Sequence, residues 1–408
     1  MLGPMFQALQ SRNYRLYFVG LLISWIGSWM QRTALGWLVY ELTGSQVLLG
    51  VVAAAVSAPI VLLSPWAGAF ADRWSKRRLL TITQLWLMTL GLTLGALVWL
   101  ELVRPGLLLL IAALEGVAMA FDMPARQAFL PEAAGRENLA NAVALNSSIV
   151  NAARIVGPSL AGIVMARFGM ALCFFLNGLS FLAVVAALMR MELSSKAKPR
   201  KGEAGWQRLR GGFAYVRQSR KLREAFGIFA VVGVFGWSYG VLMPVYAKDA
   251  LSVAEEGYGL LLSANGMGAL VGALTVARLV SLWGPERLRA IGISVFAVGL
   301  ALLAGAKSYG LAAAILFGTG WGQMLFLSST SAQVQLNVSE EVRGRVMGIW
   351  TAVFASAMPV GGLLAGFFCS RFGIQAVFLG GAAACAAAAW AAVQAARRAR
   401  PRALTPAS

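Results

Sequence analysis

Long apolar blocks alternate with short polar turns along the whole chain. Blocks such as 85–100 and 174–189 contain no charged residue and are apolar on almost every side, which is typical of helices buried in a membrane or a large core. A soluble helical solenoid would need amphipathic stripes instead. Because about 20 residues cross a bilayer core of about 30 Å, the pattern predicts an all-α membrane protein with twelve transmembrane helices, at 15–39, 47–69, 79–101, 107–125, 138–166, 170–190, 224–247, 257–281, 289–305, 308–330, 341–369 and 373–396.

Composition supports a membrane protein and argues against an enzyme. Only 12% of the residues are charged, against about 25% in soluble domains. The chain has no histidine, which excludes a His-based metal site, a Ser-His-Asp triad and a histidine proton relay. The cysteines Cys173, Cys369 and Cys385 lie in or beside apolar spans and suggest no disulfide framework. With no phosphate-cradling motif either, we expect no catalytic site, no cofactor and no metal.

The formal net charge of +19 is concentrated in loops and at the C-terminal end. The segment 194–223 contains ten lysines and arginines against the single acid Glu203. Cytoplasmic loops of membrane proteins carry such an excess, so this linker, the basic turn 73–78 and both termini are predicted to be cytoplasmic, in the inner (plasma) membrane. Basic loops are attracted to anionic lipid. We therefore expect membrane lipids and not nucleic acid as their partner.

An internal repeat divides the chain into two halves. Residues 157–169 align with 361–373 at an offset of about half the chain length, and both end in Arg-Phe-Gly. The predicted organisation is an N-terminal six-helix half at 1–190, a basic linker at 191–223, a C-terminal six-helix half at 224–396 and a cytoplasmic tail at 397–408. Such parallel repeats place a solute site between the halves near the bilayer midplane. Within the linker, 205–217 predicts either an amphipathic helix on the inner leaflet or a solvated segment.

One turn combines small and charged residues at a distinctive spacing. It resembles the loop after the second helix of the major facilitator superfamily, G-x-x-x-D-R-x-G-R-K, with Ser75 in place of the second glycine. The resemblance implies a gating loop that stabilises the outward-facing state, and a plain charge cluster is the alternative. The residues that carry it are Gly68, Asp72, Arg73, Lys76 and Arg77.

Further motifs resemble one branch of that superfamily. Segments 40–45, 121–128 and 146–162 are similar to the drug-efflux-like facilitators that include bacterial enterobactin exporters and transmembrane secretion effectors. Gly157, Pro158 and Gly162 resemble the fifth-helix motif of proton-driven antiporters, with Ala161 in place of one glycine. The resemblance implies a monomeric secondary active transporter that exports a drug-like or siderophore-like molecule by alternating access, with protons as the exchanged ion. A proton-independent facilitator or a lipid flippase of the same fold is the alternative.

Charged residues inside the predicted spans are the main candidates for chemistry. Charge within a membrane is expensive and marks functional sites, and Arg32, Glu115 and Arg154 are predicted at similar depth. We expect Glu115 to pair with Arg154 or Arg32 and to exchange protons, with Asp122 nearer the cytoplasmic exit. Structural pairing is the alternative, because two arginines would hold Glu115 ionised. The arginine that the family carries in its fourth helix, expected near Ala112, is absent.

Aromatic and amide side chains within the spans are candidates for binding a small-molecule substrate. Such groups hold amphipathic ligands, although each is individually more common in a core or at a lipid surface. The candidate cavity residues are Trp29, Gln31, Asn146, Asn151, Trp237, Tyr239, Trp321, Gln323 and Trp350.

Overall fold

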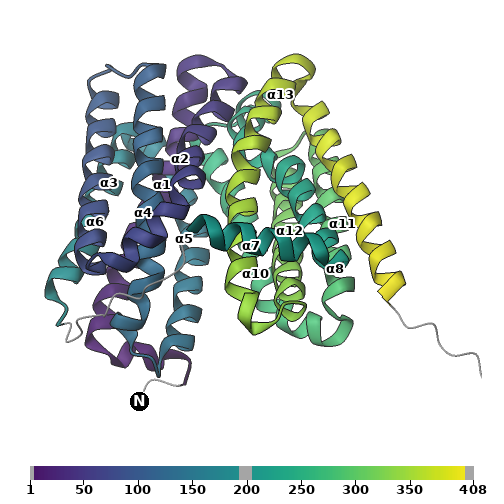
Figure 1. Cartoon of the computed structure of the whole chain (residues 1–408). Coiled ribbons are helices and arrows are strands. Elements are labelled where there is room, and N and C mark those ends of the chain that lie inside the picture. The colour runs from purple at the N-terminus through teal and green to yellow at the C-terminus, as the bar shows by residue number, and fades with distance from the viewer. Residues whose placement is uncertain (1–3, 193–204, 400–408) are drawn as a thin grey trace, which may run out of the picture.

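The computed structural model describes residues 4–192 and 205–399, without the side chains at 4–5, 64–65, 68–69, 71–73, 205–210, 341 and 396–399. These residues form two groups of long helices that lie side by side in Figure 1. The first group runs from purple to blue, and the second from teal to yellow. The all-α class predicted from the apolar blocks is confirmed.

Six long helices form the first half, after a short 3₁₀ helix at Pro4–Gln10. Ser11 and Ser45 cap α1 and α2, since their hydroxyls accept hydrogen bonds from the backbone N–H groups of Tyr14 and Leu48. Gly44, in the left-handed conformation at φ 60°, separates these two helices. The helices are α1 Arg12–Thr43, α2 Gln46–Arg73, α3 Lys76–Trp99, α4 Pro105–Ala134, α5 Leu139–Phe168 and α6 Met170–Arg190.

The second half begins with a helix of the linker and an irregular span. α7, Gly205–Gln218, runs across the long helices in Figure 1 and contacts α2 and α13. The predicted span at 224–247 is confirmed as part of the membrane-capable segment Arg220–Ala250, which π and 3₁₀ turns interrupt near its glycines and Pro244. Its parts are α8 Arg220–Val231, η2 Val232–Gly236, η3 Trp237–Leu242, α9 Met243–Val245 and η4 Tyr246–Ala250.

Four further helices complete the second half, and the last of them is bent. They are α10 Glu255–Trp283, α11 Pro285–Gly305, α12 Tyr309–Leu336 and α13 Glu340–Ala399. Gly373, at φ 80° and ψ 167°, divides α13 into two spans. Ten segments of the described residues are long and apolar enough to cross a membrane, and one of these contains both parts of α13. Together with the 32-residue α1, they account for the twelve spans in two six-helix halves.

The repeat seen in the sequence is also a repeat of backbone geometry. Gly169 ends α5 at φ 83° and ψ 165°, nearly the conformation of Gly373. A Cβ on Gly162 would lie 2.8 Å from the carbonyl oxygen of Glu255, and a Cβ on Gly366 would lie 2.5 Å from that of Gln46. Equivalent glycines therefore bring α5 against α10 and α13 against α2, which are the two most extensive contacts between the halves.

Candidate functional site

Glu115 lies in the interior of α4, ten residues after the first residue, Pro105. This separation corresponds to about 15 Å along the helix axis. Gln31 Nε2 donates to its carboxylate Oε2 at 3.3 Å. The same amide is oriented by Asn177, whose Nδ2 donates to Gln31 Oε1 at 2.8 Å. Glu115 is therefore held by a fixed neutral amide from α1. Gln31 is buried, and this predicted cavity residue forms a hydrogen bond with the Glu115 carboxylate.

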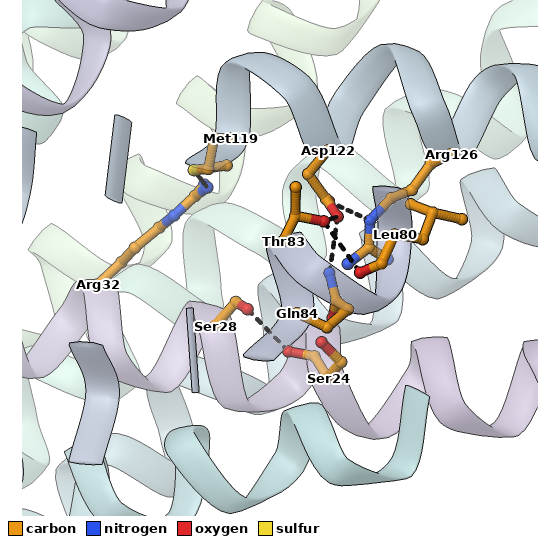
Figure 2. A network of polar contacts seen from close by, with 9 residues as sticks. All are labelled: Ser24, Ser28, Arg32, Leu80, Thr83, Gln84, Met119, Asp122 and Arg126. Atoms are coloured by element: carbon orange, nitrogen blue, oxygen red, sulfur yellow. Dashed lines mark hydrogen bonds and ion pairs between the residues drawn. The ribbon is translucent and has the colours of Figure 1, made fainter. Parts of the chain in front are cut away.

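Arg32 is at a similar depth on α1 and has weak partners. Its Nη2 lies 3.9 Å from the Met119 sulfur, and its guanidinium lies 5.5 Å from the centre of the Trp29 ring. Figure 2 shows the side chain reaching from α1 towards α4. The side chain is exposed although it is far from either end of α1. Arg32 and Glu115 form no ion pair within 4 Å in the described part of the chain.

Arg154 reaches across to the other half of the molecule. Its Nη2 donates to Asn265 Oδ1 at 2.8 Å and to Gln323 Oε1 at 3.2 Å. Asn265 Nδ2 in turn donates to the Tyr239 hydroxyl at 2.8 Å. In this structure Arg154 therefore joins α5 to α10 and α12 and does not pair with Glu115. This arrangement brings together three predicted site residues, Arg154, Tyr239 and Gln323. Gln323 contacts Arg154 directly, and Asn265, which the sequence did not indicate, connects Arg154 to Tyr239.

Asp122 belongs to a separate buried network within the first half. Its Oδ1 accepts from Thr83 Oγ1 at 2.8 Å and from Gln84 Nε2 at 2.7 Å. Its Oδ2 forms an ion pair with Arg126, one helical turn along α4. Figure 2 shows these side chains converging between α3 and α4. The i,i+4 spacing of an acid and an arginine was a usable signal for this pair, whereas the partners on α3 were not identifiable from the sequence.

The predicted gating loop is described only in part. Gly68, Asp72 and Arg73 belong to the last turns of α2, and the side chains of Asp72 and Arg73 lie outside the described residues. The side chains that follow are held within the first half. Lys76 Nζ lies 2.7 Å from Glu132, and Arg77 donates to the carbonyls of Met189 and Met191. Arginine at these last carbonyls stabilises the end of α6.

The fifth-helix motif packs α5 tightly on two sides. A Cβ on Gly157 would lie 2.5 Å from the Trp29 Cβ, so α5 approaches α1 as closely as a glycine permits. Gly162 makes the corresponding approach to α10. α5 remains helical through Pro158. The Ser159 hydroxyl donates to Ser263 Oγ at 2.6 Å, which adds a hydrogen bond between the halves.

The other predicted cavity residues are distributed over several environments. Asn146 accepts from the Tyr14 hydroxyl, Asn151 donates to a carbonyl of its own helix, and Trp321 donates to Thr275. Trp237 and Trp350 are buried in an aromatic cluster around Phe229, on which Trp350 stacks at 3.8 Å. Trp350 also borders an open hollow of about 720 Å³, lined by Leu327, Ser328, Ser331, Ala332, Gln335, Leu336, Thr351 and Phe354.

The halves also meet at the end of the bundle that contains Gly44, Gly169 and Gly373, here called the far end. The Tyr40 hydroxyl donates to Asp249. Trp37 stacks on Tyr258 with ring centres 5.3 Å apart, and Lys248 lies 5.8 Å from the Trp37 ring. These contacts close the far end between α1, η4 and α10. The sequence reading did not find them, because they join residues that lie more than 200 positions apart.

A polar interior between two repeated six-helix halves defines a multi-pass membrane transporter of the major facilitator superfamily, not an enzyme. Within that class the chain belongs to the transmembrane secretion effector family, whose model matches residues 4–405. The branch indicated by the sequence motifs is thereby confirmed.

Relatives and solved structures agree with this assignment. The chain is 27% identical over 368 residues to the staphyloferrin A transporter of Staphylococcus aureus, covering 89% of this chain and 91% of the relative. It is 27% identical over 383 residues to the multidrug efflux pump Tap of Mycobacterium bovis, covering 89% and 88%. A crystal structure of the nucleoside transporter NupG superposes with a TM-score of 0.78 at 15% identity, covering 94% of this chain and 98% of that one, and shows the shared fold.

Proposed function

We propose that this protein is a secondary active exporter, which moves a small amphipathic molecule out of the cell by alternating access in exchange for protons. The family and the two relatives, one a siderophore transporter and one a multidrug efflux pump, support a drug-like or siderophore-like substrate. The observation that carries proton exchange is the Glu115 carboxylate inside α4, held by the neutral amide of Gln31.

The surroundings of Glu115 suit a group that gains and loses a proton. A carboxylate within a membrane is expensive in its charged form. Because Gln31 carries no charge, protonation of Glu115 breaks no ion pair within 4 Å among the described residues. Asp122 is different, since protonating it would disrupt its ion pair with Arg126 and leave a partly buried cation without its carboxylate. We therefore assign proton exchange to Glu115 and a structural role to Asp122.

The basic loops suggest the orientation and therefore the state of the molecule. The excess of basic residues places both termini and the linker on the cytoplasmic side of the inner membrane. The far end then faces the opposite side of that membrane. The closed far end, with Tyr40 on Asp249, is then the outer gate of an inward-facing monomer. In the outward-facing state the turn at Asp72, Arg73, Lys76 and Arg77 would close the cytoplasmic end.

Substrate contacts are proposed on both sides of the central interface. Arg32 and Trp29 would contribute from α1, and the residues around Arg154 would contribute Tyr239 and Gln323. The aromatic cluster that contains Trp237 and Trp350 offers flat apolar surface for the hydrophobic part of a ligand. Lipids would contact the outer surface, where the exposed Phe213 of α7 lies among basic residues.

Inverted membrane vesicles that contain the protein test proton exchange directly. An imposed pH gradient, acidic inside, should drive accumulation of at least one compound from a panel of drugs and siderophores. Glu115→Gln should abolish this gradient-driven accumulation and retain exchange between labelled and unlabelled compound at equal pH. Glu41→Gln, at an exposed acid near the end of α1, is the matched control.

Each alternative function has its own outcome in this assay. Full pH-driven accumulation by Glu115→Gln would exclude Glu115 as the proton site. Equilibration without accumulation by the wild type would identify a proton-independent facilitator. Transfer of fluorescent lipid between leaflets, without transport of any compound of the panel, would identify a flippase.

A further inference from the structure

Arg32 and Glu115 are opposite charges at one depth that remain unpaired. Arg32 is eleven residues from the last residue of α1, Thr43, and Glu115 ten from the first of α4, or about 16 and 15 Å from the far ends of their helices. Each has a neutral neighbour instead of the other. The amide of Gln31 donates to Glu115, and Arg32 is flanked by the sulfur of Met119 and the ring of Trp29.

Both groups keep most of their bonding capacity. A guanidinium has five N–H donors and a carboxylate about four acceptor positions. The contacts of Arg32 with Met119 and Trp29 are weak, and Glu115 accepts one hydrogen bond, from Gln31. Arg154, by contrast, donates to amide oxygens of the opposite half. Figure 2 shows the Arg32 guanidinium beside Met119, away from the ion pair of Asp122 and Arg126. Of the two predicted cavity arginines, Arg32 is therefore the one available to a substrate.

We propose that the transported molecule is a zwitterion, whose acid group binds Arg32 and whose ammonium group binds Glu115. The inference rests on the proposed proton exchange, because a solute that displaces a proton from a carboxylate must offer a positive charge in its place. On loading, the Glu115 proton leaves to water on the same side and the ammonium takes its position. The acid group of the same molecule then forms the charge-assisted hydrogen bonds that Arg32 can donate.

The charges facing Glu115 support this coupling. α1 contributes Arg32, whereas Arg154 of α5 donates its hydrogen bonds to amides of the opposite half. α2 and α3 carry charged residues only in their end turns at 72–73 and 76–78. The ion pair of Asp122 and Arg126 is neutral overall. On substrate binding Glu115 thus changes its charge by losing a proton, and Arg32 remains positively charged throughout.

Charge counting turns the proposal into a measurable quantity. With a proton on Glu115, the pair of Arg32 and Glu115 has one net positive charge. With a zwitterion bound to ionised Glu115, the same site is neutral. One-for-one exchange therefore moves one positive charge inward per zwitterion exported. A monovalent cation would leave the site charge unchanged and make exchange electroneutral, and a monovalent anion would move two charges.

Binding is tested with three forms of one drug skeleton on the full-length protein in lipid nanodiscs. Norfloxacin is a zwitterion near neutral pH, its ethyl ester lacks the acid group, and its N-acetyl derivative lacks the ammonium group. After subtraction of empty nanodiscs, norfloxacin should bind about tenfold more tightly than either derivative, since each lost charge-assisted contact has about that weight. Equal affinities for norfloxacin and either derivative, or no binding of any of the three, would overturn the proposal.

Two variants assign the charges to the residues. Arg32→Gln should lower norfloxacin affinity to that of the ester and leave the ester unaffected. Glu115→Gln should lower norfloxacin affinity to that of the N-acetyl derivative and leave that derivative unaffected. Arg371→Gln is the control. Like Arg32, Arg371 lies over an aromatic ring, with its guanidinium 5.0 Å from the centre of the Phe367 ring, but it is on the exposed surface of α13. Loss of all three ligands in both variants would contradict the assignment.

Transport separates this inference from the proposed function. In liposomes with a potassium and valinomycin clamp, a membrane potential alone should drive norfloxacin export by the wild type. Electroneutral proton-driven export would refute the zwitterion while leaving proton exchange intact. Charge-selective binding without any proton-driven transport would refute proton exchange while leaving the zwitterion site intact.

Discussion

The two contacts that join the halves are related by the repeat but differ in chemistry. On the α5–α10 contact, Arg154 and Ser159 form hydrogen bonds to the opposite half. The equivalent positions on α13, Met358 and Leu363, are exposed and apolar. The glycines of both contacts make the same close backbone approach. The repeat has therefore kept the backbone contact and changed the side chains at these two positions, which are polar on α5 and apolar on α13.

This difference predicts unequal release when the far end opens. Hydrogen bonds between membrane helices contribute about 0.6–2 kcal/mol each. The polar contact must lose the bonds of Arg154 to Asn265 and Gln323, or exchange them for others. At the α2–α13 contact, Gly50, Gly362 and Gly366 make close backbone approaches, and the side chains at positions 358 and 363 add no hydrogen-bonding group. We expect the polar contact to set the energy of opening and the glycines of both contacts to permit closure.

Replacing the shared glycines should have the largest effect. Gly162→Val or Gly366→Val places side-chain atoms within the opposing backbone, and overpacking of this kind costs about 1–3 kcal/mol. Both variants should open the far end. Labelling of the buried Cys369 by a membrane-impermeant thiol reagent should then become about tenfold faster, in a background with Cys173→Ala and Cys385→Ala.

A glycine with free space around it serves as the control for these variants. Gly380 lies in the second span of α13, beyond the bend at Gly373, and a Cβ there would meet no atom within 4 Å. Gly380→Val should therefore leave labelling unchanged. Because Gly366 is close to Cys369 in sequence, Gly162→Val is the stricter test. Unchanged labelling in that variant would show that the α5–α10 contact does not hold the far end closed.

Making the two contacts alike should have the next largest effect. Arg154→Met introduces the residue found at the equivalent position 358 and removes both hydrogen bonds to the opposite half. At the average of about 0.6 kcal/mol per bond, the loss of two bonds costs about 1.2 kcal/mol and should speed Cys369 labelling several-fold. Transport should also fall, because Asn265 and Gln323 lose their common donor. Labelling at the wild-type rate would mean that the arginine does not stabilise the closed far end.

A double substitution sharpens the result for Arg154. If its hydrogen bonds to α10 matter, Arg154→Met and Asn265→Leu should be strongly non-additive in their effect on labelling, as expected of residues in direct contact. Met358→Leu, on the apolar contact, should be close to neutral. Additive effects of the first two substitutions would indicate that each acts through a different part of the interface.

The sequence predicted the architecture well because a membrane imposes strong constraints on it. The length of an apolar block and the charge of a loop can each be read from a short stretch of sequence. The twelve spans follow from these two properties. The repeat was visible because Gly169 and Gly373 need the same unusual backbone conformation. The interruption of the seventh span was missed, although Gly233, Gly236 and Pro244 were signals for it. Propensity alone does not show where an α-helix changes to π and 3₁₀ turns.

Partners within the site were harder to predict than its members. Depth counting predicted Arg32, Glu115 and Arg154 at similar depth, but depth does not define which way a side chain turns. Arg154 faces the opposite half, where Asn265 and Gln323 accept its hydrogen bonds. Identifying those amides requires knowing which helices adjoin across the interface. That information lies in the packing of residues more than 100 positions apart, which a single sequence does not contain.

Removing the smaller polar group of the α5–α10 contact should have the smallest effect. Ser159→Ala deletes one hydrogen bond, and Ser263 keeps its bonds to the carbonyls of Ile155 and Gly259. No donor of Ser263 is left unsatisfied. We therefore expect the closed far end to lose about 0.6 kcal/mol of stability and Cys369 labelling to become two- to threefold faster. Leu363→Ala, at the equivalent position of α13, should change labelling less. If Ser159→Ala matched Arg154→Met instead, the serine pair and not the arginine would dominate the polar contact, and the difference between the two contacts would have to be assigned to the outer turns of α5 and α10.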